Sequence, residues 1–304
     1  MGNRGSHYAP RHRRKPVIRK EETITLSDFD GESRRHGRIV VARAKSLGKA
    51  VENWLKAEAR KQVTRVVNEI RQYGPRAVMR TKKAMEDWDD EKLLRILALY
   101  GVRQIEDSGL EIAGSSWVFK PTVKAEYLLE RQIMIQGLKK SLEKEMRGAV
   151  GTALGTWFIE EPGLTVGQIS QRLRTWLTVS TSKDTPLALK PLGRRFTAEG
   201  LGARARMIAR TETNRARNFG RIEAGKVMGA EYFIWLAETD GLSGDRQHDA
   251  LNRQVRPVGE NFVNPATGAS LAYPGDGDAE EVINCRCSVR PLTADQARQF
   301  GYGD

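Results

Sequence analysis

The stretch ARARMIARTETNRARNFGRIEAGKVMG, residues 203–229, is the best starting point for the fold of this chain. Its apolar side chains recur every three to four residues, which predicts one long helix with a buried side. Gly229 is a suitable C-terminal stop for such a helix. The apolar positions are Met207, Ile208, Phe219, Ile222 and Val227.

Charged residues form two groups on this predicted helix. Glu212 and Arg215 are three positions apart and close to the apolar side, so their side chains can meet. Because an unpaired charge on a buried side destabilises a helix, we expect a semi-buried pair. At 100° per residue, four arginines fall within a stripe of about 60°. We expect that stripe to face outward, either as a solvated surface or as a DNA contact: Arg206, Arg210, Arg217 and Arg221.

The helix is also the first of five short blocks that occupy roughly the last third of the chain. They are an Arg-Thr-Glu helix, an aromatic-rich strand, an Asp/Arg/His cluster, a Pro-Gly-Asp turn and a closing Asn-Cys-Arg-Cys. Here they read ARTETNRARNFGRIEAGKVMG, YFIWLAETDGLSGDRQHDALNRQV and LAYPGDGDAEEVINCRC. In this order they resemble the Mu-F-like minor head proteins of tailed bacteriophages, also called head morphogenesis proteins.

The resemblance implies a virion protein that acts in head assembly and in DNA packaging or ejection. Such a protein associates with the portal protein and with capsid and scaffold proteins in the host cytoplasm. It is then carried in the phage head near the portal, in several copies, in contact with double-stranded DNA. We expect no cofactor other than the structural zinc considered below.

Composition is compatible with this implication. The net charge of +13 and the pI of about 9.9 favour polyanionic partners. No apolar run approaches the roughly 18–20 residues of a membrane span. The basic N-terminus has no apolar segment after it, so we expect no signal peptide. Two cysteines, Cys285 and Cys287, argue against a secreted disulfide framework.

The pattern predicts an α+β protein, with a mainly helical N-terminal region followed by a small α+β C-terminal domain built on the one long helix. We expect a basic flexible arm over residues 1–37, a helical domain over 38–180, a linker over 181–200 and the Mu-F-like domain over 201–304. Residues 1–20 contain no acid, so the arm can follow a phosphate backbone or an acidic protein groove, or remain a solvated tail. Its candidate DNA contacts are Arg4, Arg11, Arg13, Arg14 and Lys15.

Local signals place the individual elements. Helices are predicted over 38–73, ended by Gly74-Pro75, over 76–88 and 90–105, and from Pro121 onward, with a glycine-containing segment at 109–118. Thr165 and Gln168 have capping-box spacing and predict a helix to residue 177. Strands are predicted at 232–236, 255–258, 281–283 and 288–290, a helical turn at 245–251 and a last helix at 293–300. Residues 261–273 are predicted to be a hairpin and loop, either plain surface or a docking loop.

One cluster of residues has zinc-ligand chemistry: Asp240, Asp245, His248, Cys285 and Cys287. Two cysteines at i and i+2 can face one ion, and zinc accepts histidine and carboxylate beside them. The spacing is not the C-x₂-C of common zinc modules. A structural zinc site therefore competes with a second interpretation, in which Cys285 is a small buried hydrophobe and His248 binds the turn at Asn284. We assign Asn284, with Glu212 and Arg215, to a structural polar core.

Two other functions remain open. His248, Arg246, Glu212 and Thr211 are residue types that metal-independent nucleases use, which makes a nuclease or toxin the alternative enzyme. Against it, this cluster holds a single histidine and no second acid or base at a defined spacing. A non-specific DNA-binding architectural protein is the other alternative. We expect no enzyme, and nothing in the sequence indicates readout of bases.

Overall fold

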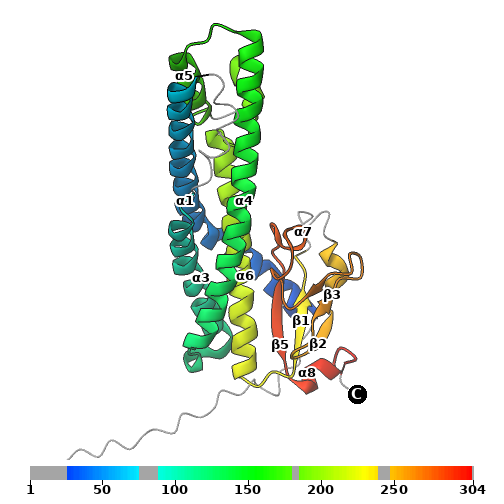
Figure 1. The fold of residues 1–304 in the computed structure, drawn as a ribbon. Helices are drawn as coiled ribbons and strands as arrows, with labels where there is room; N and C mark the ends of the chain where they lie inside the picture. The colour runs from blue at the N-terminus through cyan, green and yellow to red at the C-terminus, as the bar shows by residue number, and fades with distance from the viewer. Residues whose placement is uncertain (1–25, 75–87, 180–184, 239–246, 303–304) are drawn as a thin grey trace, which may run out of the picture.

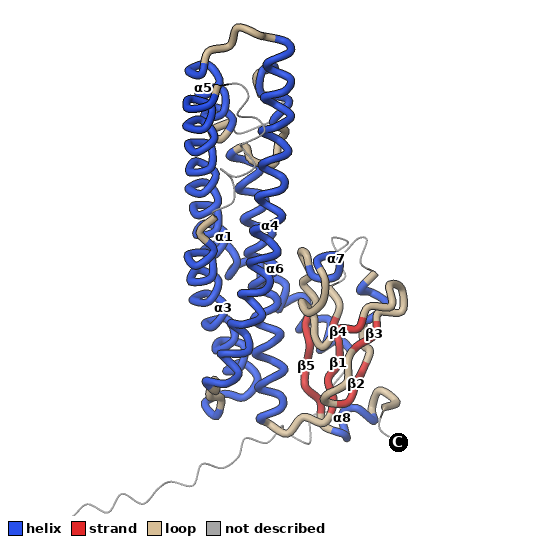
Figure 2. The backbone as a smooth tube through the Cα atoms, viewed as in Figure 1, coloured by secondary structure: helices blue, strands red, loops and turns tan. Residues whose placement is uncertain are grey.

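The protein combines a long helical bundle with a small strand-containing module beside it (Figure 1). The computed structural model describes residues 26–74, 88–179, 185–238 and 247–302. Strands occur only in the small module of this described part (Figure 2). The predicted fold, a helical N-terminal region followed by a small α+β C-terminal part, is confirmed. The long helices are α1 Leu26–Tyr73, α3 Asp90–Ala113, α4 Pro121–Glu160, α5 Val166–Trp176 and α6 Ala198–Val227.

Local signals explain where several helices begin and end. Gly74 follows α1 with a φ of +66°, which glycine adopts without steric cost. Pro121 occupies the first turn of α4, where its missing N–H costs nothing. Thr165 and Gln168 form the predicted capping box at the start of α5. None of the described helices has both the length and the apolar character that crossing a membrane requires.

The bundle core lies between α1, α3, α4, α5 and the first half of α6. The segment that precedes α6 belongs to this core, because it contains the 3₁₀ helix η3, Leu187–Leu192, and buries Leu189 and Phe196. The Trp176 indole donates to Gly193 O at 3.0 Å, which fastens this segment further. The described part of the expected linker, from residue 185 onward, is therefore packed and does not separate two domains.

The module is built on a three-stranded antiparallel sheet with the order β2-β1-β5. Its faces alternate along β1: Phe233 and Trp235 join the core that includes α6, whereas Ile234 and Leu236 join the opposite core. The elements of the module are β1 Tyr232–Leu236, the 3₁₀ helix η5 His248–Leu251, β2 Val255–Pro257, the hairpin of β3 Phe262–Val263 and β4 Ser270–Leu271, α7 Ala279–Val282, β5 Ser288–Leu292 and α8 Ala294–Arg298.

The N-terminal turns of α1 cover the second face of this sheet. Phe29 is 1% exposed, and its ring lies 5.1 Å from that of Phe300. Ser33 Oγ donates to Ala237 O at 2.9 Å, just beyond β1. Residues 26–37 are thus helical and packed, and the expected arm is wrong over this range. This packing is hard to predict from sequence, because half of the buried positions are polar and their partners lie about 200 residues away.

Other differences from the predicted elements are local. Residues 281–283 do not form a strand, because α7 is one helical turn that ends at Val282. Helix α3 continues to Ala113, through the first half of the glycine-containing segment at 109–118. That continuation is stabilised by packing, since Gly109 lies against the Trp117 indole. The predicted helix over 76–88 falls almost entirely outside the described residues.

Candidate metal centre and basic surface

Helix α6 carries a buried charged cluster on the side that faces α4. Glu212 Oε2 accepts from Arg131 Nη1 at 2.7 Å, and Glu212 Oε1 lies 3.7 Å from Arg215 Nη1. Arg215 also donates to the carbonyls of Gly275 and Gly277. The sequence analysis paired Glu212 with Arg215 but missed Arg131, its closer partner. The helical spacing could have predicted that Arg131 is buried, since it lies four residues from both Tyr127 and Ile135, which are buried on α4.

The expected outward arginine stripe is wrong at Arg217 and Arg221. Arg217 is 0% exposed and lies 2.5 Å from Glu111 of α3. Arg221 lies 2.6 Å from Glu32 of α1 and donates to Val289 O of β5 at 3.1 Å. Every residue of α6 from 211 to 222 is buried. The helical spacing of the arginines predicts an exposed stripe only if one side of the helix faces solvent. Residues 211–222 of α6 have no such side.

The other two arginines of the stripe do reach the surface. Arg206 is exposed and lies near Glu52, whereas Arg210 is half-buried. Burial lowers the pKa of Arg210, and the positive charges of Arg286 and Arg206 lower it further. Arg210 Nε has no hydrogen-bond partner among the described residues. Arg206, Arg210 and Arg286, here called the arginine cluster, therefore concentrate positive charge that a bound anion would relieve.

The zinc-ligand candidates His248, Cys285 and Cys287 meet inside the module. Their ligand atoms all lie within 4.8 Å of one another. His248 Nδ1 is 3.6 Å from each of the two Sγ atoms. The three residues are 1–2% exposed. The indole of Trp235 packs edge-on against the imidazole at 5.4 Å, which holds the ring in place.

Glu281 of α7 fixes the other nitrogen of the imidazole. His248 Nε2 donates to Glu281 Oε2 at 2.9 Å. Glu281 also accepts from Thr267 Oγ1 at 2.7 Å and from Asn264 Nδ2 at 3.3 Å, both in the β3–β4 hairpin. Glu281 was not predicted as a partner of His248, because in a strand over 281–283 nothing would indicate that its side chain points toward the histidine. In the competing interpretation His248 binds the turn at Asn284, but its partners among the described residues are Glu281, Cys285 and Cys287.

The protonation of this group is strongly perturbed. Hydrogen bonding from Cys285 and the nearby His248 hold the pKa of Cys287 well below its usual range, although burial opposes them. Burial acts to lower the pKa of His248, but Cys287 and Glu281 outweigh it and raise that pKa. Burial likewise opposes the lowered pKa of Glu281, which its three hydrogen-bond donors produce. The two opposite shifts are those of a Cys287 thiolate and a His248 imidazolium that stabilise each other.

The Cys-Arg-Cys segment is fastened to α6 by backbone contacts. Asn284 adopts a left-handed φ of +60°, which asparagine tolerates better than most residues, and its N–H donates to Thr211 Oγ1 at 3.1 Å. Asn218, which the sequence analysis missed, donates to Pro274 O and Cys287 O at 3.0 Å each. Its Oδ1 accepts from Val289 N at 3.1 Å. Helix α6 thus holds both the Pro-Gly-Asp turn and the start of β5.

The described residues that were considered for nuclease chemistry make structural contacts. Thr211, Glu212 and His248 are buried and engaged in the contacts described above. Arg246 lies outside the described residues, as do Asp240 and Asp245 among the ligand candidates and all five arm residues proposed for DNA.

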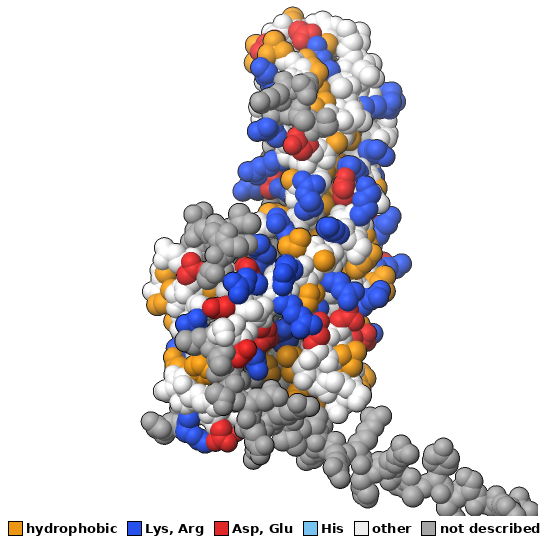
Figure 3. Space-filling view, turned by 180° about the vertical axis from the view of Figure 1, so that it is seen from behind, with side chains coloured by type: hydrophobic (Ala, Val, Ile, Leu, Met, Phe, Trp, Pro, Cys, Tyr) orange, Lys and Arg blue, Asp and Glu red, His pale blue; other side chains and the backbone are white. Residues whose placement is uncertain are grey.

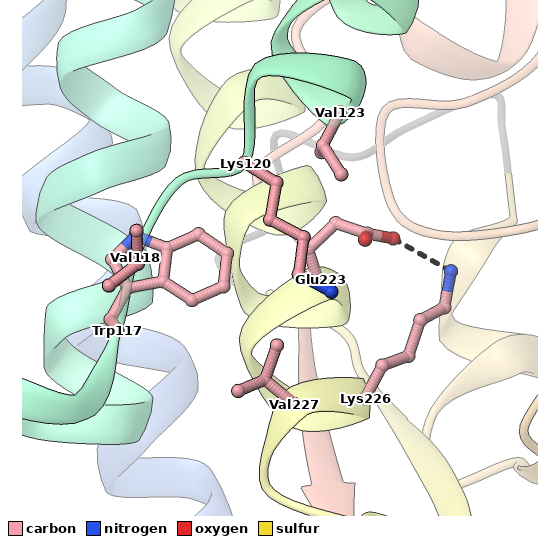
Figure 4. A pocket seen from close by; sticks show the side chains of 7 residues that line it. All are labelled: Trp117, Val118, Lys120, Val123, Glu223, Lys226 and Val227. Carbon is pink, nitrogen blue, oxygen red and sulfur yellow. Dashed lines mark hydrogen bonds and ion pairs between the residues drawn. The ribbon is translucent and has the colours of Figure 1, made fainter.

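A small pocket lies at the C-terminal end of α6 (Figure 4). Trp117 and Val118 form one side, and Glu223, Lys226 and Val227 of α6 form the other. The Lys226 ammonium lies 2.7 Å from the Glu223 carboxylate. The lining holds no histidine or cysteine, so it offers no counterpart to the His248 site.

Comparisons with models of protein families, with curated proteins and with solved structures find no match for this chain.

Proposed function

We propose that this chain is a minor head protein of a tailed bacteriophage, associated with the portal, the procapsid interior and the packaged DNA. The observation that carries the proposal is the convergence of the five sequence blocks on one another. Asn218 of the helix block binds Pro274 and Cys287 of two later blocks. Trp235 and His248 link the aromatic strand and the histidine cluster to the same core. Blocks that resemble one family in order therefore form one packed unit.

The distribution of charge supports contact with DNA. Lys and Arg side chains gather on the bundle face next to the module (Figure 3), and the net charge is +13. The arginine cluster lies where α6 meets the Cys-Arg-Cys segment. Contacts of this kind are made to phosphates, so they position a protein on DNA without reading sequence, and they weaken as salt rises.

The bundle supports contact with a protein shell or portal. Leu129 and Ile133 lie one turn apart on α4 and are 61% and 66% exposed. Ile159, near the other end of α4, is 83% exposed. The adjacent pair of Leu129 and Ile133 is suited to packing against another protein.

Mass spectrometry of gradient-purified phage particles and DNA-empty shells tests the proposal. We expect the protein at low copy number in full particles. Its presence or absence in emptied shells then shows whether it leaves with the DNA. Absence from every particle form would overturn the proposal and favour a DNA-binding protein that acts outside the virion.

The DNA contact has its own test. We expect Arg206→Ala/Arg210→Ala to weaken binding to double-stranded DNA and to make the salt dependence of log K shallower by up to about two units, one for each lost phosphate contact. Arg95→Ala/Lys140→Ala removes the same charge from exposed positions elsewhere on the bundle and is the control. Equal effects of the two double variants would show that net charge alone drives binding.

A further inference from the structure

We propose that His248 Nδ1, Cys285 Sγ and Cys287 Sγ bind a structural zinc ion that joins η5 to the start of β5. The inference is independent of the function proposed above, because it rests only on the three side chains and their surroundings. Zinc suits such a set of one imidazole and two thiolates.

The spacing of the ligand atoms fits a shared ion. With Zn–S of about 2.3 Å, Zn–N of about 2.0–2.1 Å and tetrahedral angles, a nitrogen and a sulfur on one zinc lie about 3.5 Å apart. The structure places His248 Nδ1 3.6 Å from Cys285 Sγ and 3.6 Å from Cys287 Sγ. Two equal separations of this size leave room for one ion between the three atoms.

The backbone explains why cysteines at i and i+2 converge. Side chains two residues apart in extended chain lie on the same side. The Cys285 N–H donates to Val282 O at 3.0 Å, and Cys287 O accepts from Asn218. The chain is therefore fixed on both sides of Arg286, and both sulfurs face His248.

The surroundings of the imidazole are those of a metal ligand. Metal-bound histidines almost always donate their other N–H to a carboxylate, a carbonyl or water, which orients the ring. His248 Nε2 donates to Glu281, and Glu281 is itself held by Thr267 and Asn264. A buried carboxylate needs hydrogen-bond donors, and His248 is the one histidine among the described donors to Glu281. The arrangement leaves Nδ1 for the ion.

The described residues supply three ligand atoms to this group. A tetrahedral zinc takes its fourth ligand from a water molecule or a further side chain. The role is structural, because the three proposed ligands are 1–2% exposed and come from two segments that are 37–39 residues apart in sequence. Bridging them restricts the unfolded chain and adds binding energy to folding.

Metal analysis of the full chain, purified under reducing conditions with zinc present, tests the proposal. We expect one zinc ion per chain, which Cys285→Ser/Cys287→Ser loses. Cobalt(II) added to the metal-free wild type should show thiolate charge-transfer bands and the strong visible absorption of a tetrahedral ion. This second measurement uses the wild type, so it holds even if the double variant fails to fold. A wild type that binds neither metal, or a double variant that binds zinc equally, would overturn the proposal.

Glu281→Gln tests the role of the carboxylate with all ligands in place. We expect zinc affinity, measured by competition with a chromogenic chelator, to fall about 10–100-fold. Glu280→Gln is the matched control, since the neighbouring Glu280 is exposed, and should leave affinity unchanged. Equal zinc affinities of the two variants would contradict the role of Glu281 in orienting His248. A Cys285–Cys287 disulfide that re-forms after reduction even when zinc is present would contradict the proposed site.

Discussion

Arg131, Arg217 and Arg221 keep their charges inside the protein because each meets a carboxylate from another helix. Arg131 binds Glu212, while the other two bind Glu111 and Glu32. A buried pair is not strongly stabilising by itself, but the loss of one partner leaves an uncompensated charge away from water. Removal of one of these carboxylates should therefore cause a large loss in the free energy of unfolding.

Glu212→Ala should destabilise the protein by about 3–5 kcal/mol, because it leaves Arg131, which is 2% exposed, with the 49% exposed side chain of Glu130 at 3.3 Å as its remaining described ion-pair partner. Chemical denaturation measures the change. Glu91→Ala, which breaks an exposed pair with Arg95 on α3, is the control and should have little effect. Equal midpoints for the two variants would mean that Arg131 finds another partner when Glu212 is gone.

His36 predicts a dependence of stability on pH. Burial, followed by the charges of Arg221 and Arg217, lowers the pKa of this histidine well below its ordinary value of 6.5. Below pH 6.5 the unfolded chain therefore binds a proton that the folded protein does not, and the free energy of unfolding should fall as pH drops. Denaturation of the wild type and of His36→Gln from about pH 7.5 to about pH 5 measures this. The variant should show a shallower slope, and parallel slopes would contradict the burial of a neutral imidazole.

Spacing along α6 predicted contacts within the helix but not those with other elements. The pairing of Glu212 with Arg215 follows from the helical repeat, as does the exposure of Arg206 near the start. The burial of Arg217 and Arg221 depends on Glu111 and Glu32, which lie 106 and 189 residues away. No periodicity in one helix contains that information.

Element boundaries were predictable where a residue has a strong local effect. Gly74, Pro121 and the Thr165–Gln168 box each fix a helix end through their own backbone or cap. The strand predicted at 281–283 was wrong because Val282 and Ile283 alone are too short an apolar run to separate a strand from one helical turn. Glu281 was missed for the same reason, and with it the support of the His248 site.

The close packing of α6 against α3 depends on Gly220. An added Cβ there would lie 2.5 Å from Ile105 O and 2.3 Å from Ser108 Oγ. Gly220→Ala should therefore destabilise the protein by about 1–3 kcal/mol through overpacking, even though alanine favours helices. Gly155→Ala in α4, where a Cβ meets nothing within 4 Å, should stabilise by about 0.5–1 kcal/mol. Thermal melting of the two variants tests both predictions. A higher melting temperature for Gly220→Ala would contradict the close contact between α6 and α3.

The bundle and the module share elements across the whole molecule. Helix α6 contributes to the bundle core with its first half and to the module core with its second. Helix α1 likewise lines the bundle and covers the sheet with Phe29. The expected division into an arm, a helical domain, a linker and a separate α+β domain does not describe this packing, because composition along the chain does not show which segments meet.

Phe29→Ala should loosen the module selectively. The change removes the ring that fills the core between α1, β1 and β5, with a cost of about 3–5 kcal/mol. Hydrogen exchange should accelerate in β1 and β5 and stay unchanged in α5, at the far end of the bundle (Figure 1). Leu99→Ala, at a 72% exposed position, is the control. Uniform acceleration across the chain would show that the two parts unfold together.

The contact between Phe29 and Phe300 also sets an order of events during synthesis. At roughly 5–20 residues per second, the ribosome needs on the order of 15–60 seconds to travel from one codon to the other. During that time the first turns of α1 have left the ribosome while the strands they cover do not yet exist. Helices α1, α3, α4 and α5 can pack in this interval, whereas the contact with Phe300 forms only after that residue has emerged. The packing of the first turns of α1 is thus completed by a segment that is synthesised long after them.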